Sequence, residues 1–125
     1  MLTFDEAEDA LFDMVDSLPQ EILRGLNCGV VLLPDLITDE NDLLVLGTYH
    51  VEPVGLGRYV TIHYGSIFEA YGHLPADAFK KKLRSVLHHE LVHHLENLAG
   101  DRQLEIKDAF DKARYLGRRT AAKNN

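Results

Sequence analysis

The chain has 125 residues, of which 46% are hydrophobic and 26% charged, with 9 Gly and 4 Pro. This length predicts one domain, residues 1–125, and the composition excludes disordered, collagen-like and low-complexity classes. The formal net charge of −7 disfavours nucleic-acid binding, which requires cationic side chains to neutralise phosphates. No apolar run approaches the roughly 20 residues of a membrane-spanning helix. Because the N-terminus is acidic where a secretory signal is basic and then apolar, we expect a cytoplasmic protein with no membrane partner.

The first elements in chain order are two helices. Thr3 and Glu6 have the spacing of a capping box, and apolar residues recur behind them at helical spacing to about residue 17. Pro19 suits the first turn of a second short helix that runs to about residue 26.

The middle of the chain predicts a small sheet. Residues 28–33 form a short apolar run that we interpret as a buried strand, in which Cys28 is a small core residue. Residues 43–50 and 58–64 are two further β-rich runs, and the turn-prone stretch between them predicts a hairpin. Residues 66–71 fit a single helical turn.

The last third predicts two helices. A long helix begins at Pro75 and is expected to end near Leu98, because Gly100 occupies the position where helices commonly terminate. A final helix covers about residues 104–116. Helices, then a three- or four-stranded sheet, then helices indicate an α+β domain.

The long helix carries a candidate metal site. His89-Glu90-x-x-His93 is the HExxH pattern, in which two imidazoles four residues apart lie on one helical face and can bind one zinc ion. Glu90 points away by about 100°, so it can accept a proton from water without ligating the ion. About 0.03 such matches are expected in a shuffled chain of this composition, so the context has to support the motif. A helical wheel supplies that context, because both histidines flank an apolar stripe.

Two further histidines adjoin the motif. His88 projects away from the metal face and is expected to be exposed. His94 falls inside the apolar stripe, which favours a buried, hydrogen-bonded residue that supports the site over a ligand.

Residues 75–105, with LHHELVHHLENLAGDRQLE at their centre, resemble the small bacterial single-domain zincin-like metallopeptidases. Residues 29–34, 46–49 and 57–62 fit the same family, so the resemblance covers most of the chain. It implies a minimal zincin-like fold: N-terminal helices, a small mixed sheet, an active-site helix and a C-terminal helix. It further implies zinc, one ion per chain, and a peptide or protein substrate. No oligomeric state follows from it.

The third metal ligand is where the sequence departs from the family pattern. Other branches carry HExxHHxGxxD, but the corresponding glycine and aspartate positions are Glu96 and Ala99 here. Gly100 and Asp101 could supply the same turn and carboxylate two residues later, so Asp101 is the first choice. Glu105 is the second, and Glu96 is expected to support the site or line its cleft.

The aromatic-rich strand at residues 58–64 is interpreted as an edge strand with half-buried aromatics. In zincins the equivalent edge pairs with extended substrate, and Tyr64 or Tyr115 is a possible oxyanion or substrate contact.

The sequence suggests three alternative functions. The leading one is a zinc-dependent peptidase in which Glu90 is the general base, with nickel, cobalt or copper as metals that could replace zinc during purification. The alternative is a catalytically weak metal-binding or peptide-binding module of the same fold. A metal-dependent RNA hydrolase with H-x3-H-x5-H is disfavoured because Ala99 stands where the third histidine belongs.

Overall fold

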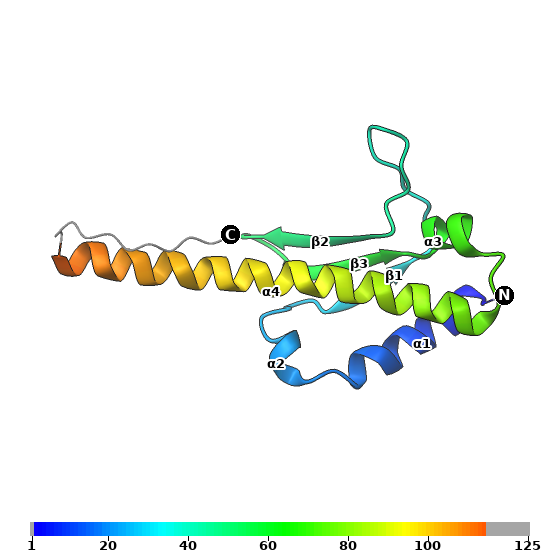
Figure 1. Ribbon diagram of the computed structural model, residues 1–125, viewed down its shortest axis with the longest axis horizontal. Coiled ribbons are helices and arrows are strands. Elements are labelled where there is room, and N and C mark those ends of the chain that lie inside the picture. The colour runs from blue at the N-terminus through cyan, green and yellow to red at the C-terminus, as the bar shows by residue number, and fades with distance from the viewer. Residues whose placement is uncertain (1, 115–125) are drawn as a thin grey trace. The chain divides into compact units, whose positions relative to one another are not determined.

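The computed structural model describes the backbone of residues 2–114 and the side chains of residues 2–100. The chain divides into two compact units, Met1–His94 and Leu95–Asn125. Within the described residues the architecture is α+β, with four helices and one mixed sheet, which confirms the predicted class (Figure 1). In chain order the elements are α1 (Phe4–Asp16), α2 (Gln20–Leu23), β1 (Val30–Leu33), β2 (Gly47–Glu52), β3 (Gly57–His63), α3 (Tyr64–Tyr71) and α4 (Ala76–Arg114).

Helix α1 begins where the capping box predicted. The Thr3 hydroxyl accepts a hydrogen bond from the Glu6 backbone N–H at 3.2 Å, and the Thr3 backbone N–H donates to Glu6 Oε1 at 3.0 Å. These contacts satisfy two backbone donors that the first helical turn leaves without partners. The hydrogen bonds from Thr3 also lower the pKa of the Glu6 carboxyl, because they stabilise its charged form.

The sheet has three strands in the order β1-β3-β2. Strands β2 and β3 form the predicted hairpin, with Thr48 opposite Thr61, while β1 lies parallel to β3 with Leu32 opposite Ile62. The prediction that residues 58–64 form an edge strand is therefore wrong. β3 is central because it pairs on both sides, and a polar-apolar alternation within one strand does not reveal how many neighbours that strand has.

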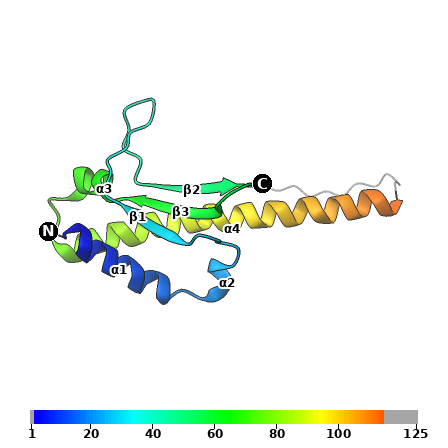
Figure 2. The ribbon, with the colours of Figure 1, turned by 180° about the vertical axis from the view of Figure 1, so that it is seen from behind.

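One face of the sheet is covered by α1 and by the first part of α4, which lie on the same side of it (Figures 1 and 2). Val60 and Ile62 of β3 are fully buried on this face. They belong to one hydrophobic core with residues of both helices: Ala7, Leu11 and Met14 from α1, and Phe79, Leu83, Val86, Leu87 and Leu91 from α4. The apolar stripe of α4 expected from the helical wheel is thus the face that packs on the sheet.

Helix α4 does not end where predicted. Its backbone continues through Gly100 to Arg114, so the separate helix expected over residues 104–116 is part of α4 as far as the structure describes it. A glycine costs an exposed helix only about 1 kcal/mol relative to alanine, which the neighbouring good helix formers can offset. The turn that would have presented Asp101 is therefore not formed.

Smaller differences concern Cys28 and Pro19. Cys28 is exposed, two residues before β1 begins, so its prediction as a core residue is wrong. Pro19 is the N-cap of α2 and not a residue of its first turn. Within residues 2–114, none of the helices combines the length and the apolar character that crossing a bilayer requires.

Candidate metal centre and catalytic cleft

The HExxH residues lie on helix α4, within the first unit. The imidazoles of His89 and His93 project from successive turns, with their rings nearly perpendicular at 86° and their centroids 4.8 Å apart. Their Nε2 atoms are 3.2 Å apart, and both side chains are exposed. Two nitrogens at the usual zinc–nitrogen distance on a tetrahedral ion would be separated by about 3.3–3.4 Å. The pair therefore has the spacing that one zinc ion requires of two of its ligands.

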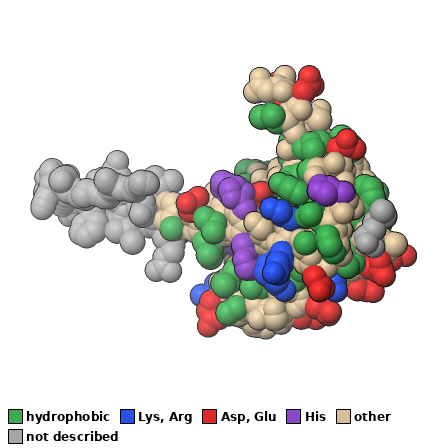
Figure 3. Space-filling view, turned by 45° about the vertical axis from the view of Figure 1, so that its right-hand side comes forward, with side chains coloured by type: hydrophobic (Ala, Val, Ile, Leu, Met, Phe, Trp, Pro, Cys, Tyr) green, Lys and Arg blue, Asp and Glu red, His purple; other side chains and the backbone are tan. Residues whose placement is uncertain are grey.

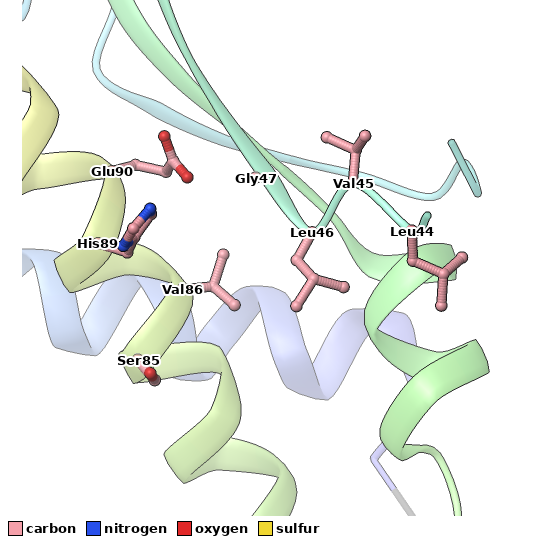
Figure 4. Close-up of a pocket in the computed structure, with 8 residues that line it drawn as sticks. All are labelled: Leu44, Val45, Leu46, Gly47, Ser85, Val86, His89 and Glu90. Atoms are coloured by element: carbon pink, nitrogen blue, oxygen red, sulfur yellow. The ribbon is translucent and has the colours of Figure 1, made fainter. Parts of the chain in front are cut away.

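Glu90 occupies the boundary between this pair and the sheet. Its side chain is 7% exposed, and it faces Gly47 at the start of β2 (Figure 4). A β-carbon built on Gly47 would lie 3.1 Å from Glu90 Cγ and 2.8 Å from Cγ1 of Val86. Only glycine lets β2 approach α4 this closely. This role of Gly47 could not be predicted from the sequence, because glycine in a strand carries no signal of what it contacts.

A cavity of about 370 Å³ opens beside His89 and Glu90. Figure 4 shows Val86 of α4 and Leu46 of the opposite wall pointing toward one another below Glu90 and His89. The residues that line the cavity are Leu44, Val45, Leu46 and Gly47 on one side, and Ser85, Val86, His89 and Glu90 on the other. The volume falls at the lower end of the roughly 300–1,000 Å³ typical of ligand sites.

His94 is fully buried and makes two hydrogen bonds, which confirms the prediction of a buried, hydrogen-bonded residue. Its Nε2–H donates to the backbone carbonyl of Arg24 at 2.8 Å. Its Nδ1 then accepts from the Tyr49 hydroxyl at 2.7 Å. These bonds join α4, at the residue that follows His93, to strand β2 and to the chain segment that follows α2. His88, by contrast, is exposed, as expected.

Residue His63, which was not among the residues predicted from the sequence, holds both ends of the loop at residues 35–46. The end of this loop forms the wall of the cavity opposite α4. The backbone N–H of His63 donates to the carbonyl of Leu46 at 2.9 Å, and its Nδ1–H donates to Asp35 Oδ1 at 2.8 Å. The buried Ser66 hydroxyl also accepts from the Ile37 N–H and donates to the Ile37 carbonyl. Residues 35–46 are consequently anchored before any ligand binds.

Tyr64 lies away from the histidine pair. Its hydroxyl donates to the backbone carbonyl of Leu2, and its ring packs against Phe4, Phe68 and Phe79. Phe79 precedes His89 by ten residues, about 15 Å along a helix axis. Burial raises the pKa of the Tyr64 phenol, which fits a structural residue. Because its contacts lie far from the histidine pair, the structure does not bring Tyr64 to the oxyanion position.

The candidate third ligands belong to the second unit. Glu96 is an exposed residue of the helix in that unit. The side chains of Asp101 and Glu105, and the whole of Tyr115, lie outside the described residues. Among the side chains that the structure describes, no group of three or more His, Cys, Asp or Glu residues could hold a metal ion. The described part of the site thus contains two imidazoles and one adjacent carboxylate.

The face of the molecule seen in Figure 3 is mixed in side-chain composition. Histidine side chains lie at separate places on one face of the described part, each near hydrophobic side chains (Figure 3).

Strand β2, on the side away from β3, pairs with no further strand among residues 2–114, and it runs from Gly47 beside Glu90. The edge that lies next to the histidine pair is therefore β2, in place of the strand at residues 58–64 that the sequence suggested.

The chain is similar to solved structures, one of which covers most of its length. No protein-family profile matches the chain, and no curated protein matches it. A solved structure described as a conserved hypothetical protein from Thermo thermophilus is similar at a TM-score of 0.67 and 28% sequence identity. The similarity covers 79% of this chain and 99% of the other. It supports the α+β fold, and the printed description attributes no activity to that protein.

Proposed function

We propose that this chain is a zinc-dependent metallopeptidase with a minimal zincin-like fold. The observation that carries the proposal is the convergence of His89 and His93, whose Nε2 atoms are 3.2 Å apart beside a buried glutamate. Because two histidines four residues apart approach each other on any helix, the proposal also depends on the buried Glu90 and on the cleft beside the pair.

The side chains have distinct roles in this proposal. His89 and His93 hold the ion, and the contacts of His94 keep the helical turn that carries His93 fixed against β2. When bound, zinc supplies Lewis acidity, which lowers the pKa of water and polarises a carbonyl oxygen. Glu90 takes a proton from a water molecule while the water oxygen attacks the peptide carbonyl. Glu90 later passes that proton to the departing amine. The burial of Glu90 limits competing solvent at its carboxylate.

An extended peptide is the substrate that the cleft suits. On the side away from β3, β2 pairs with no further strand among residues 2–114, so an extended peptide can add there as a strand through backbone hydrogen bonds. Gly47 lies at the point where this edge meets Glu90, so a peptide paired with β2 has backbone carbonyls close to the catalytic carboxylate. This placement supports peptide hydrolysis more than chemistry on a small molecule.

The third ligand remains a proposal from the sequence. Asp101 is the first candidate and Glu105 the second, while Glu96 is assigned to supporting the site. Elemental analysis of untagged protein should find close to one zinc per chain, and His89→Ala or His93→Ala should each remove it. Asp101→Ala should weaken zinc binding by orders of magnitude, whereas Glu96→Ala should weaken it by no more than about 10–100-fold. A comparable loss in Glu105→Ala alone would make Glu105 the ligand.

Catalysis is tested by Glu90→Gln, which keeps the shape of the side chain and removes its basic oxygen. Zinc content should stay near one per chain, and cleavage of a pool of unfolded peptides should fall by at least about 10²–10⁴-fold. A chelator is the control for metal dependence. If zinc-loaded wild-type protein binds peptides and cuts none, the chain is the metal-binding or peptide-binding module of the alternative hypothesis.

A further inference from the structure

We propose that the C-terminal part of helix α4 pairs antiparallel with the same helix of a second copy of this chain. The first observation is an exposed apolar stripe on α4. Val92 is 51% exposed and Leu95 is 41% exposed, and Ala99 is exposed as well. Residues spaced by three and four positions lie on one side of a helix, so these three side chains form one stripe, which we call the outer stripe.

The outer stripe is distinct from the face of α4 that packs on the sheet. Leu87 and Leu91 belong to the hydrophobic core and are 0% and 3% exposed. Because a helix turns by about 100° per residue, Val92 and Ala99 lie about 80–100° around the helix from Leu91. The outer stripe is therefore a second apolar surface of α4, and the proposed peptidase reaction does not use it.

The spacing of the outer stripe continues in the sequence beyond Ala99. If Val92 is given heptad position a, the later a and d positions are Leu95, Ala99, Arg102, Ile106, Ala109 and Ala113. All of these are apolar except Arg102. The backbone is helical throughout, and the side chains from residue 101 onward lie outside the described residues, so their heptad positions follow from spacing alone. An apolar a/d repeat sustained over about three heptads is typical of paired helices.

This part of α4 needs packing contacts to remain helical. Residues 95–114 are helical and belong to the unit Leu95–Asn125, in which α4 is the only element that the structure describes. An isolated helix of this length is marginally stable in water, and Gly100 weakens it further. Helices in proteins are stabilised mainly by burial of an apolar face, which a partner on the outer stripe would supply.

The charge distribution favours a second copy as that partner, in antiparallel orientation. Residues 95–106 contain three acidic residues and one basic residue, a net charge of −2. Residues 107–125 contain six basic and two acidic residues, a net charge of +4. Antiparallel pairing of two identical helices places the acidic part of each copy beside the basic part of the other, and it also opposes the two helix dipoles. Parallel pairing would place like charges together.

The sequence is compatible with a close antiparallel contact. Overlap of residues 95–113 in the two copies aligns position 99 of one copy with position 109 of the other, and both are alanine. Position 95, a leucine, is aligned with position 113, an alanine. Arg102 is aligned with position 106, and a single polar residue in an apolar seam fixes the register at some cost in stability.

Sedimentation equilibrium of the full, untagged chain with a chelator present tests the pairing. We expect a mass of twice the 14.1 kDa of one chain, and the chelator prevents exposed histidines of two copies from sharing a metal ion. Leu95→Glu should raise the dissociation constant by about tenfold per copy, or about 100-fold for the dimer, because it places a carboxylate in the seam. Leu43→Glu is the matched control, since Leu43 is 63% exposed in the loop at residues 35–46. Circular dichroism verifies that both variants keep their helical content.

Disulfide formation in a Cys28→Ser background, which removes the lone cysteine, determines the orientation. An equimolar mixture of Ala99→Cys and Ala109→Cys chains should form a mixed disulfide-linked dimer in a glutathione buffer. Each variant alone should form at least about tenfold less, because the two like positions are separated in the antiparallel pair. Parallel pairing would instead link each variant to itself.

The outcomes decide the inference without reference to catalysis. A chain that is monomeric at every concentration, a dimer that dissociates when the chelator is added, or a dimer that Leu95→Glu and Leu43→Glu weaken equally overturns the pairing. Linkage of Ala99→Cys chains to one another in preference to the mixed dimer overturns the antiparallel orientation. Zinc content and peptide cleavage, which test the proposed function, are measured separately.

Discussion

Replacement of Gly47 by alanine tests the close approach of β2 to helix α4. The added β-carbon would lie 2.8 Å from Val86 Cγ1, closer than carbon atoms pack without one of them moving. Overpacking of this kind costs about 1–3 kcal/mol, and removing a flexible glycine from a strand returns about 0.5–1 kcal/mol. The free energy of unfolding should therefore fall by about 0.5–2 kcal/mol, as the difference of these two effects.

Urea unfolding followed by far-ultraviolet circular dichroism measures this change. The matched control is Gly100→Ala, a helical glycine whose added β-carbon would meet nothing within 4 Å, which should be neutral or stabilising by up to about 1 kcal/mol. Val86→Ala removes the atom that clashes, so the double variant Gly47→Ala/Val86→Ala should be less destabilised than the sum of the single changes by at least about 0.5 kcal/mol.

The same substitution reports on the role proposed for the Glu90 carboxylate. The β-carbon would also lie 3.1 Å from Glu90 Cγ, so relief of the contact moves Glu90. Peptide cleavage should fall by about 10–100-fold, since small displacements of a catalytic group have large effects on rate, while zinc content stays the same. A Gly47→Ala protein that is as stable and as active as wild type, with additive effects in the double variant, would refute the reasoning.

Two further predictions concern hydrogen bonds that the structure describes. Tyr49→Phe leaves Nδ1 of the buried His94 without its donor, which should cost about 1–3 kcal/mol of unfolding free energy in the same urea assay; an unchanged value would mean that Tyr49 does not satisfy His94. Thr3→Ala should destabilise the fold by about 0.5–2 kcal/mol through loss of the cap of α1. The pKa of Glu6 is lowered in the folded state, so its contribution to stability is present above its ordinary value of 4.5 and is lost as the pH falls through the lower folded value. Wild type should lose stability in that acidic range more steeply than Thr3→Ala, and parallel pH profiles would contradict the assignment.

Local features of the fold could be predicted from the sequence because their causes lie within a few residues. The Thr3–Glu6 capping box spans four residues, and its hydrogen bonds join only the N-cap and the first turn of α1. The β2–β3 hairpin follows from two β-rich runs separated by a turn. His94 could be predicted as buried because the helical wheel alone places it in the apolar stripe.

Other features depend on contacts between residues distant in the sequence, and these could not be predicted. The loop that contains the Thr38–Leu44 pair is held by Ser66 and His63, which lie more than 15 residues away in the sequence. Cys28 stands in an apolar run that looks buried, but β1 begins two residues later and leaves it exposed. Tyr64 has the chemistry of an oxyanion donor, yet its hydroxyl bonds to the carbonyl of Leu2.

The sequence by itself determined the candidate chemistry of this protein: the spacing of His89, Glu90 and His93 on a helix orients two imidazoles together whatever surrounds them. Only the tertiary structure decided the cleft. The neighbours of a strand are set by pairing across the sheet, so β2 and not β3 became the edge beside the histidines. The residues that face Val86 and Glu90, including Gly47, lie about 40 positions earlier in the chain. They come close to helix α4 only when the hydrophobic core forms.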